Sequence, residues 1–266
     1  MWEVTPKAGG TYDAASFYSQ AYTGGRYCLF AEPDNHYAYS ELRNFLTEYD
    51  LHGQKCLEVG SGRGAFQNIV SDYTGIDLAD SVRNYYRKPF HVGSAEELPF
   101  DSGSFDVIWS ITVLEHVPDP EKALSEMIRV LKNQGLIFLK PAWNCRPWIC
   151  EGIPVRSWSS LSLRQKLIKL TLPVRDSVAF RASHTLPLRM WRSLSGLLFR
   201  RRKLAFRRLK ADYSTFWMVD SDACSSIDPF DAIQWFQAGG HEVLSHPTWS
   251  SAFLSRSEPL VVRVRK

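Results

Sequence analysis

The sequence lacks the features that mark membrane-spanning or exported proteins. Its 266 residues contain no apolar run of the roughly 18–20 residues that a transmembrane helix needs. The first seven residues do not show the basic and then apolar order of a signal peptide. We therefore expect a cytoplasmic protein.

Cysteine is also scarce, and its placement excludes two kinds of stabilisation. The five cysteines are odd in number, form no C-x-x-C pair and do not stand with histidines at zinc-ligand spacing. This predicts reduced thiols and no structural metal. With 44% hydrophobic and 23% charged residues, the chain is neither disordered nor fibrous, and it has the length of one large domain or of a domain with an insertion.

Acidic residues are nearly absent from one stretch of the chain. Residues 161–210 contain fourteen Lys or Arg and a single acid, Asp176, which gives this stretch a charge of +13. Because the whole chain carries only +4, the remainder carries −9. A basic segment on an acidic body indicates an anionic partner for that segment.

Strand-like and helix-like blocks alternate through the middle of the chain. Short apolar runs predict strands at 55–59, 73–76, 90–92, 105–109 and 136–139, with helices at 65–71 and from Pro120 between them. A further helix follows Asp228, and strands at 242–245 and 260–264 are close enough to pair antiparallel. We predict an α/β, Rossmann-like, seven-stranded and mostly parallel sheet with helices on both faces.

A glycine-rich loop follows the first predicted strand. Gly60, Gly62 and Gly64 allow the backbone to approach a ligand without a Cβ atom in the way. The loop alone also fits the dinucleotide fingerprint. Glu58 before the loop opposes a pyrophosphate and suits a ligand with an amino group and a sulfonium, while Asp77, at the end of the next strand, suits two ribose hydroxyls.

Several ordered motifs together resemble the class I S-adenosylmethionine-dependent methyltransferases, in the small-molecule branch of quinone and sterol methyltransferases. The motifs are residues 57–64, 75–77, 95–100, 105–108, 113–116 and 131–135, within about a third of the chain. The resemblance implies an enzyme that binds S-adenosylmethionine. A dehydrogenase that binds a nicotinamide cofactor is the residual alternative.

The resemblance implies a place for each part of this methyl donor. The donor-binding residues would be Glu58, Gly60, Ser61, Gly62, Gly64, Asp77, Leu78, Ser94, Ala95, Glu96, Ser110 and Ile111. The first five would face the methionine moiety, Asp77 the ribose, the next four the adenine, and the last two the sulfonium. Ser94 stands where the family usually has Asp, which predicts a weaker contact with the adenine amino group.

Two histidines are candidate bases for the acceptor. His116 follows the fourth predicted strand, and His184 lies further along the chain. A histidine at a helix start that only bonds backbone remains an alternative for His116. Residues 110–113 lack the Asn/Asp-Pro-Pro-aromatic tetrad and the Pro-Cys nucleophile of nucleobase methyltransferases, which argues against a nucleic-acid substrate.

These observations divide the chain into four regions. Residues 1–54 would be a loose arm and a helix, 55–140 the donor-binding core, 141–226 an inserted helical and basic cap, and 227–266 a helix and strand pair that complete the core. Tryptophans in the cap would either wall the acceptor pocket or form the cap's own core; they are Trp143, Trp148 and Trp158.

The expected function is transfer of the methyl of S-adenosylmethionine to a small molecule or a glycan- or lipid-linked intermediate, at oxygen. The basic 161–210 segment would cover the site and touch an anionic inner membrane surface. A soluble anionic substrate, a solvated helix face or RNA would also account for its charge. A non-catalytic S-adenosylmethionine-binding partner module and an RNA-modifying methyltransferase remain alternative functions.

Overall fold

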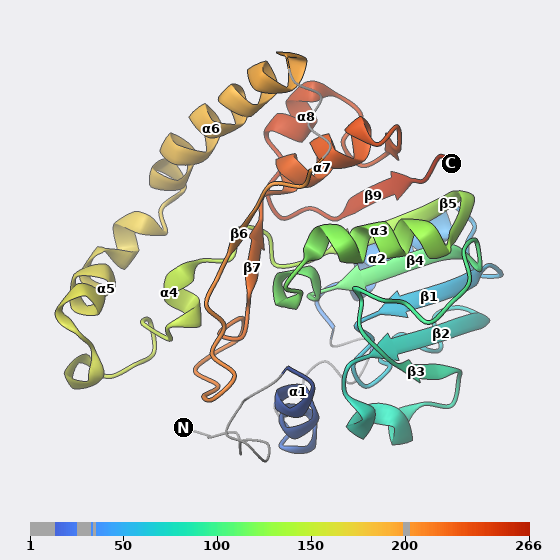
Figure 1. The fold of residues 1–266 in the computed structure, drawn as a ribbon, viewed down its shortest axis with the longest axis horizontal. Helices are drawn as coiled ribbons and strands as arrows, with labels where there is room; N and C mark the ends of the chain where they lie inside the picture. Colours follow the sequence, from blue (N-terminus) through green and yellow to red (C-terminus); the bar gives the residue numbers. More distant parts are fainter. Residues whose placement is uncertain (1–13, 26–32, 34–35, 199–202) are drawn as a thin grey trace.

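A seven-stranded sheet forms the centre of the computed structural model, which describes residues 14–25, 33, 36–198 and 203–266 (Figure 1). Its strands are β1 (Lys55–Val59), β2 (Asp72–Asp77), β3 (Phe90–Val92), β4 (Phe105–Ile111), β5 (Leu131–Lys140), β8 (Glu242–Val243) and β9 (Leu260–Arg263). They lie in the order β3-β2-β1-β4-β5-β9-β8. The first five are parallel, and β9 pairs antiparallel with both β5 and β8, which confirms the predicted sheet.

Helices cover both faces of the sheet. On one face, α2 (Tyr39–Glu48) buries Leu42, Phe45 and Leu46 against the strands. On the other face, α3 (Pro120–Val130) and α7 (Pro229–Ala238) pack into a second core. Both of these helices begin with Asp-Pro, and each Asp accepts a backbone N–H of its first turn, as expected for an N-cap.

The N-terminal region contains a helix where the sequence predicts only a loose arm. Residues Ala14–Thr23 form α1, which packs against the 3-10 helix η3 (Asp80–Tyr85). Phe17 and Ala21, one helical turn apart, are fully buried. The prediction of a loose arm is therefore wrong for this segment. The segment is rich in Tyr and Ser, and its apolar face is too short to give a clear helical pattern in the sequence.

The predicted helix at 65–71 is also absent. The chain there makes consecutive turns, with N–H groups donating three residues back from Gly64 to Ser61 and from Gln67 to Gly64. The Gln67 side chain donates to the carbonyl of Tyr85 and accepts from the N–H of Arg87. These cross-links hold the segment in turns.

Residues 141–226 leave the sheet and return to it. They contain α4 (Pro147–Cys150), the 3-10 helix η5 (Trp158–Ser160), α5 (Leu163–Arg175), α6 (Val178–Leu198) and β6 (Phe206–Arg208), and β7 (Ser225–Ile227) ends one residue beyond them. Figure 1 shows α5 and α6 projecting from the body as an arm, and β6 paired with β7 along the return. Arg200–Arg202, part of the predicted basic run, lie outside the described residues. No described helix is long and apolar enough to cross a membrane.

Candidate functional site

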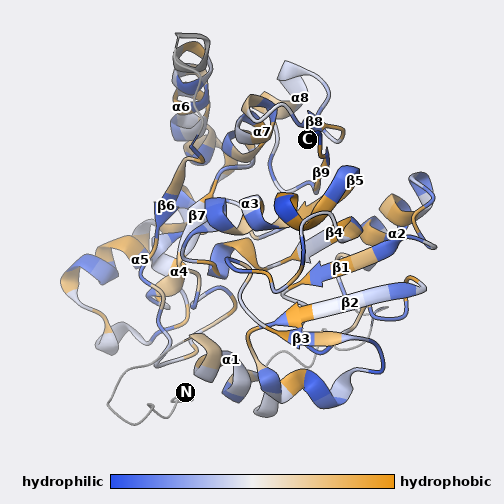
Figure 2. Cartoon of the chain, turned by 45° about the vertical axis from the view of Figure 1, so that its right-hand side comes forward, coloured by the Kyte–Doolittle hydropathy of each residue, from blue (hydrophilic) through white to orange (hydrophobic). Residues whose placement is uncertain are grey.

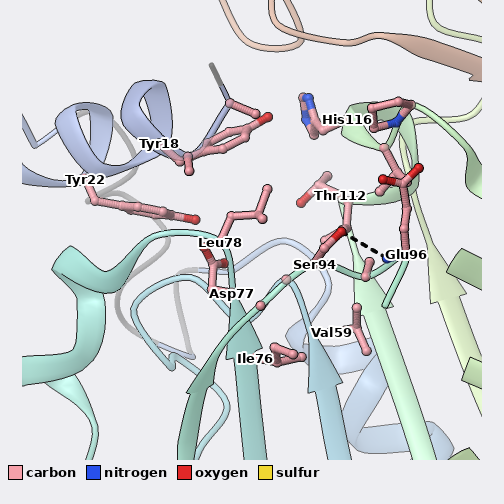
Figure 3. Close-up of a pocket in the computed structure, with 18 residues that line it drawn as sticks. Tyr18, Tyr22, Val59, Ile76, Asp77, Leu78, Ser94, Glu96, Thr112 and His116 are labelled. Atoms are coloured by element: carbon pink, nitrogen blue, oxygen red, sulfur yellow. Dashed lines mark hydrogen bonds between the residues drawn. The ribbon is translucent and has the colours of Figure 1, made fainter. Parts of the chain in front are cut away.

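A pocket of about 370 Å³ opens at the carboxyl ends of β1, β2, β3 and β4 (Figure 3). The strand order reverses between β1 and β4, so the loops after these strands diverge and leave a crevice there. The volume is that of a small-molecule site. Seven of the residues expected to act line it: Gly60, Asp77, Leu78, Ser94, Ala95, Glu96 and His116.

The glycine loop is shaped by contacts that exclude side chains. Gly60 has a φ of +74°, and a Cβ there would lie 2.2 Å from Cγ2 of Val113. The N–H groups of Gly60 and Ser61 both donate to the carbonyl of Ile76, at 2.8 and 3.0 Å. These bonds tie the loop to the end of β2. Gly62 and Gly64 shape the loop from outside the pocket lining.

Asp77 connects this loop to the pocket. One carboxylate oxygen accepts the N–H of Gly62 at 2.8 Å, and the other accepts the N–H of Ala79 at 3.0 Å. Burial raises the pKa of Asp77, and these hydrogen bonds oppose that rise. A carboxylate has about four acceptor positions, so acceptor capacity remains for a ligand in the pocket that Asp77 lines.

Glu58 is placed differently from the expectation. Its side chain is buried outside the pocket lining and accepts a hydrogen bond from the hydroxyl of Tyr73. Burial raises the pKa of Glu58 to about 8. A carboxyl that is largely protonated near neutrality repels a pyrophosphate weakly, so this residue no longer separates the two cofactors as sharply as its sequence position suggests.

The wall after β4 begins two residues later than predicted. β4 continues to Ile111, so Ser110 and Ile111 are buried in the sheet, and the Ser110 hydroxyl donates to the carbonyl of Val59 at 3.0 Å. Neither lines the pocket; Thr112 and Val113 do. The prediction that Ser110 and Ile111 line the pocket is therefore wrong, and the next two residues, Thr112 and Val113, line it instead.

A short turn after β3 forms the opposite wall. The Ser94 hydroxyl accepts the N–H of Glu96 at 3.1 Å (Figure 3). Oε1 of Glu96 accepts the N–H of Asp119 at 2.8 Å. Ala95, between Ser94 and Glu96, lines the pocket. Ser94 thus uses one of its two acceptor lone pairs within its own turn.

A polar cluster lies beside the pocket around His116, in the 3-10 helix η4 (Leu114–His116). Nδ1 of His116 is 3.2 Å from Oδ2 of Asp222, which also accepts the hydroxyl of Tyr18 at 2.7 Å. Glu115 accepts the N–H of Ala142 at 2.9 Å. The cluster therefore joins α1, the core and the return of the inserted region.

Burial and neighbouring charges shift the pKa values of His116 and Glu115 in this cluster. Burial lowers the pKa of His116, but Asp222, Glu115 and Asp220 outweigh it and leave the pKa raised. Burial raises the pKa of Glu115 to about 7, against the opposing effect of His116. Within the described residues, Oε2 of Glu115, Oδ1 of Asp222 and Nδ1 of His116 are buried without a hydrogen bond, so the contact between His116 and Asp222 is an ion pair.

The same cluster has the spacing of a cation site. Ligand atoms of Glu115, His116 and Asp220 lie within 4.8 Å of one another. Carboxylate and imidazole groups at this separation can share a proton or hold a divalent cation.

Other expected residues are not brought to the pocket. His184, the second candidate base, is exposed on α6 and places Nδ1 2.8 Å from the carbonyl of Phe180. The three cap tryptophans do not line the pocket either; Trp143 packs against the core and Trp158 is half exposed.

Sequence reasoning also missed residues that line the pocket or touch His116. These are Tyr18, Tyr22, Thr112, Val113 and Asp222. Figure 3 shows Tyr18 and Tyr22 projecting from α1 over the pocket, across from His116. Their spacing of four residues was a usable signal, whereas nothing in the sequence links Asp222 to His116.

Comparisons with known proteins relate the middle of the chain to methyltransferases. Residues 57–139, about a third of the chain, match the family model described as a methyltransferase domain. The chain is 29% identical over 141 residues to the phthiotriol/phenolphthiotriol dimycocerosates methyltransferase of Mycobacterium tuberculosis. The aligned region covers 46% of this chain and 52% of that protein.

Two further relatives show the same partial coverage. The 2-methyl-6-phytyl-1,4-hydroquinone methyltransferase of Synechocystis is 32% identical over 139 residues, 47% of this chain and 43% of that protein. The ubiquinone biosynthesis O-methyltransferase of Pseudomonas aeruginosa is 32% identical over 106 residues, 34% of this chain and 44% of that protein. The chain thus spans about half the length, or less, of the curated relatives it matches.

Proposed function

We propose that this chain, whose residues 57–139 form a class I S-adenosylmethionine-dependent methyltransferase domain, transfers the methyl of S-adenosylmethionine to a lipid-linked or other small acceptor at oxygen. The pocket at the carboxyl ends of β1, β2, β3 and β4 carries the proposal. Gly60, Asp77 and Ala95 meet there from three separate motifs of that domain.

The pocket supplies contacts suited to each part of the donor. Asp77 keeps acceptor capacity for the ribose hydroxyls, and the apolar side chains of Ile76 and Leu78 would line the adenine side. Tyr18 and Tyr22 cover the pocket from α1 and limit access of water. The bound donor supplies an activated methyl, so the chain's own task is to position an acceptor and to remove its proton.

His116 is the proposed base for an acceptor hydroxyl. It lines the pocket, and Asp222 both orients the ring and stabilises the imidazolium that forms when the proton arrives. Tyr18 in turn holds Asp222. Methylation at oxygen releases a proton, and a histidine with a raised pKa is suited to accept it.

Names of the relatives favour a lipid-like acceptor. One is a methyltransferase of dimycocerosates, one of a phytyl hydroquinone, and one an O-methyltransferase of ubiquinone biosynthesis. We infer an acceptor with a polar head that enters the pocket and an apolar tail, met by the chain at an anionic membrane surface. A glycan head group on such a lipid also fits this description.

The proposal is tested by following the methyl group. The purified chain is incubated with S-adenosylmethionine labelled in its methyl, together with a total lipid extract, a soluble metabolite extract or bulk RNA. Label in the organic phase, lost in Gly60→Val because that side chain collides with Val113, is the expected result. Label in RNA would overturn the lipid acceptor. Donor binding without transfer to any pool would instead support a non-catalytic binding module.

A further inference from the structure

The helix α5 exposes an apolar stripe that the fold leaves uncovered. Leu163, Leu167, Leu170 and Val174 are 81%, 66%, 65% and 59% exposed and recur at the spacing of one helical face. The helix is well defined, since Ser162 and Gln165 form a capping box at its start. No residue of α5 is buried, and each of these four side chains is more than half exposed in the described part of the chain.

The second half of α6 is oriented by charge pairs. Arg189 donates to Asp228, and Arg192 pairs with Asp231, so both arginines hold this half against α7. Residues 190, 191 and 194 lie on the opposite side of a 3.6-residue helix. These residues are Met190, Trp191 and Leu194, and they are 56%, 67% and 57% exposed.

Cationic side chains flank the stripe on α5. In helical projection Arg164 and Arg175 lie on one side of it and Lys166 on the other. Each of these charged ends also has a contact within the chain: Arg164 pairs with Glu151 at 3.2 Å, and Arg175 and Lys166 lie over the rings of Trp148 and Trp158. Their long apolar stems can lie along the stripe. Figure 1 shows both helices projecting from the body, and Figure 2 shows hydrophobic residues along the outer part of α5.

We propose that these two surfaces form a docking face for a lipid bilayer that contains anionic lipid. The docking face comprises Leu163, Leu167, Leu170 and Val174 of α5 and Met190, Trp191 and Leu194 of α6. An apolar stripe flanked by Lys and Arg is the pattern of a helix that lies in the membrane interface. Its basic residues attract the anionic head groups, and its apolar residues enter the acyl boundary.

Two other occupants fit this face less well. A second copy of the chain would bring another basic segment of +13 against the first, and like charges repel. RNA would engage the cations but would leave the aliphatic stripe of α5 exposed, because stacking on bases needs aromatic side chains. A bilayer accounts for both the apolar residues and the charge.

Co-sedimentation with vesicles tests this proposal on the full chain. Vesicles of phosphatidylcholine alone are compared with vesicles that also contain phosphatidylglycerol. The wild type is expected to bind the anionic vesicles about tenfold or more tightly, and added salt should weaken this binding. The double variant L167Q/L170Q should lose about tenfold or more of it, because two side chains no longer enter the lipid.

A matched control uses exposed apolar residues elsewhere. Val219 and Leu254 are 56% and 59% exposed outside the docking face, so V219Q/L254Q removes similar surface and should bind as the wild type does. Equal loss in both double variants, or equal binding to neutral and anionic vesicles, would overturn the proposal. A wild-type dimer that L167Q/L170Q converts to a monomer, with no vesicle binding, would assign the face to a second copy. Vesicle binding needs no methyl transfer, so this proposal and the proposed function fail separately.

Discussion

Two amphipathic helices of this chain carry the same kind of pattern and meet opposite environments. In α3, Ala123, Leu124, Met127 and Val130 recur at helical spacing and are all fully buried. In α5, Leu163, Leu167, Leu170 and Val174 also recur at helical spacing and are at least 59% exposed. Helical periodicity of apolar residues is therefore present in both helices, but it does not indicate what covers the apolar face.

The difference reflects what each helix can pack against. α3 lies over parallel strands whose apolar residues face it, and Asp119 caps its start. α5 belongs to the inserted region, whose basic residues set it apart from the acidic remainder of the chain. A buried apolar face stabilises the fold, whereas an exposed one is available for a partner.

The largest expected effect comes from shortening the same residue type in the two helices. Leu124→Ala should lower the free energy of unfolding by about 2–5 kcal/mol, because it leaves a cavity in the core. Leu167→Ala should change it by no more than about 0.5 kcal/mol, because the side chain is mostly exposed. Urea denaturation of both variants measures the contrast. Equal losses would mean that the α5 stripe is covered in solution.

A second test concerns the buried carboxyl of Glu58, which lies in the core of the sheet and not in the inserted region. The pKa of Glu58 is about 8 in the folded state, against an ordinary value of 4.5. Between these two pH values the folded state keeps the Glu58 carboxyl protonated and the unfolded state does not, so the free energy of unfolding falls as the pH rises from 4.5 to 8. In Glu58→Gln the free energy of unfolding should fall by up to about 4 kcal/mol less over this pH range than it does in the wild type. Unfolding measured from pH 5 to 8.5, with exposed Glu97→Gln as the control, checks this. A wild type whose stability does not fall over this range would contradict it.

A smaller effect is expected where the inserted region touches the core. Asp222→Asn removes the charge that opposes burial at His116, so the pKa of His116 should fall. In the wild type the charge pair of His116 and Asp222 stabilises the folded state fully below pH 6.5, and this stabilisation is lost as the pH rises through the raised pKa of His116. NMR titration of the His116 ring measures the shift without any substrate. An unchanged pKa would remove Asp222 as a positioning residue.

The buried half of the molecule could be predicted from the sequence with fair completeness. Buried parallel strands appear as apolar runs, and Asp-Pro pairs mark the starts of α3 and α7, so the strands and two helices followed from local signals. Gly60, Asp77 and Ala95 could be assigned to one edge of the sheet because each stands at the end of a predicted strand or in the turn after it.

The remaining features depend on contacts between distant segments. Asp222 reaches His116 only through the return of the inserted region, and no local pattern encodes such a pairing. Ser110 and Ile111 were misplaced because β4 runs two residues further than its apolar run suggests. The orientation of Glu58 toward Tyr73 likewise depends on the packing of two strands and not on the spacing from the glycine loop.

The central claim is that the pocket beside Asp77 binds S-adenosylmethionine. Calorimetric titration of the wild type and of Asp77→Ala, with S-adenosylmethionine and separately with NAD, tests it most directly. We expect the wild type to bind S-adenosylmethionine and not NAD, and Asp77→Ala to weaken that binding by roughly 1.5–3 kcal/mol, about 10- to 150-fold, through loss of the ribose contact. Binding of NAD, or binding of S-adenosylmethionine that Asp77→Ala leaves unchanged, would contradict the claim.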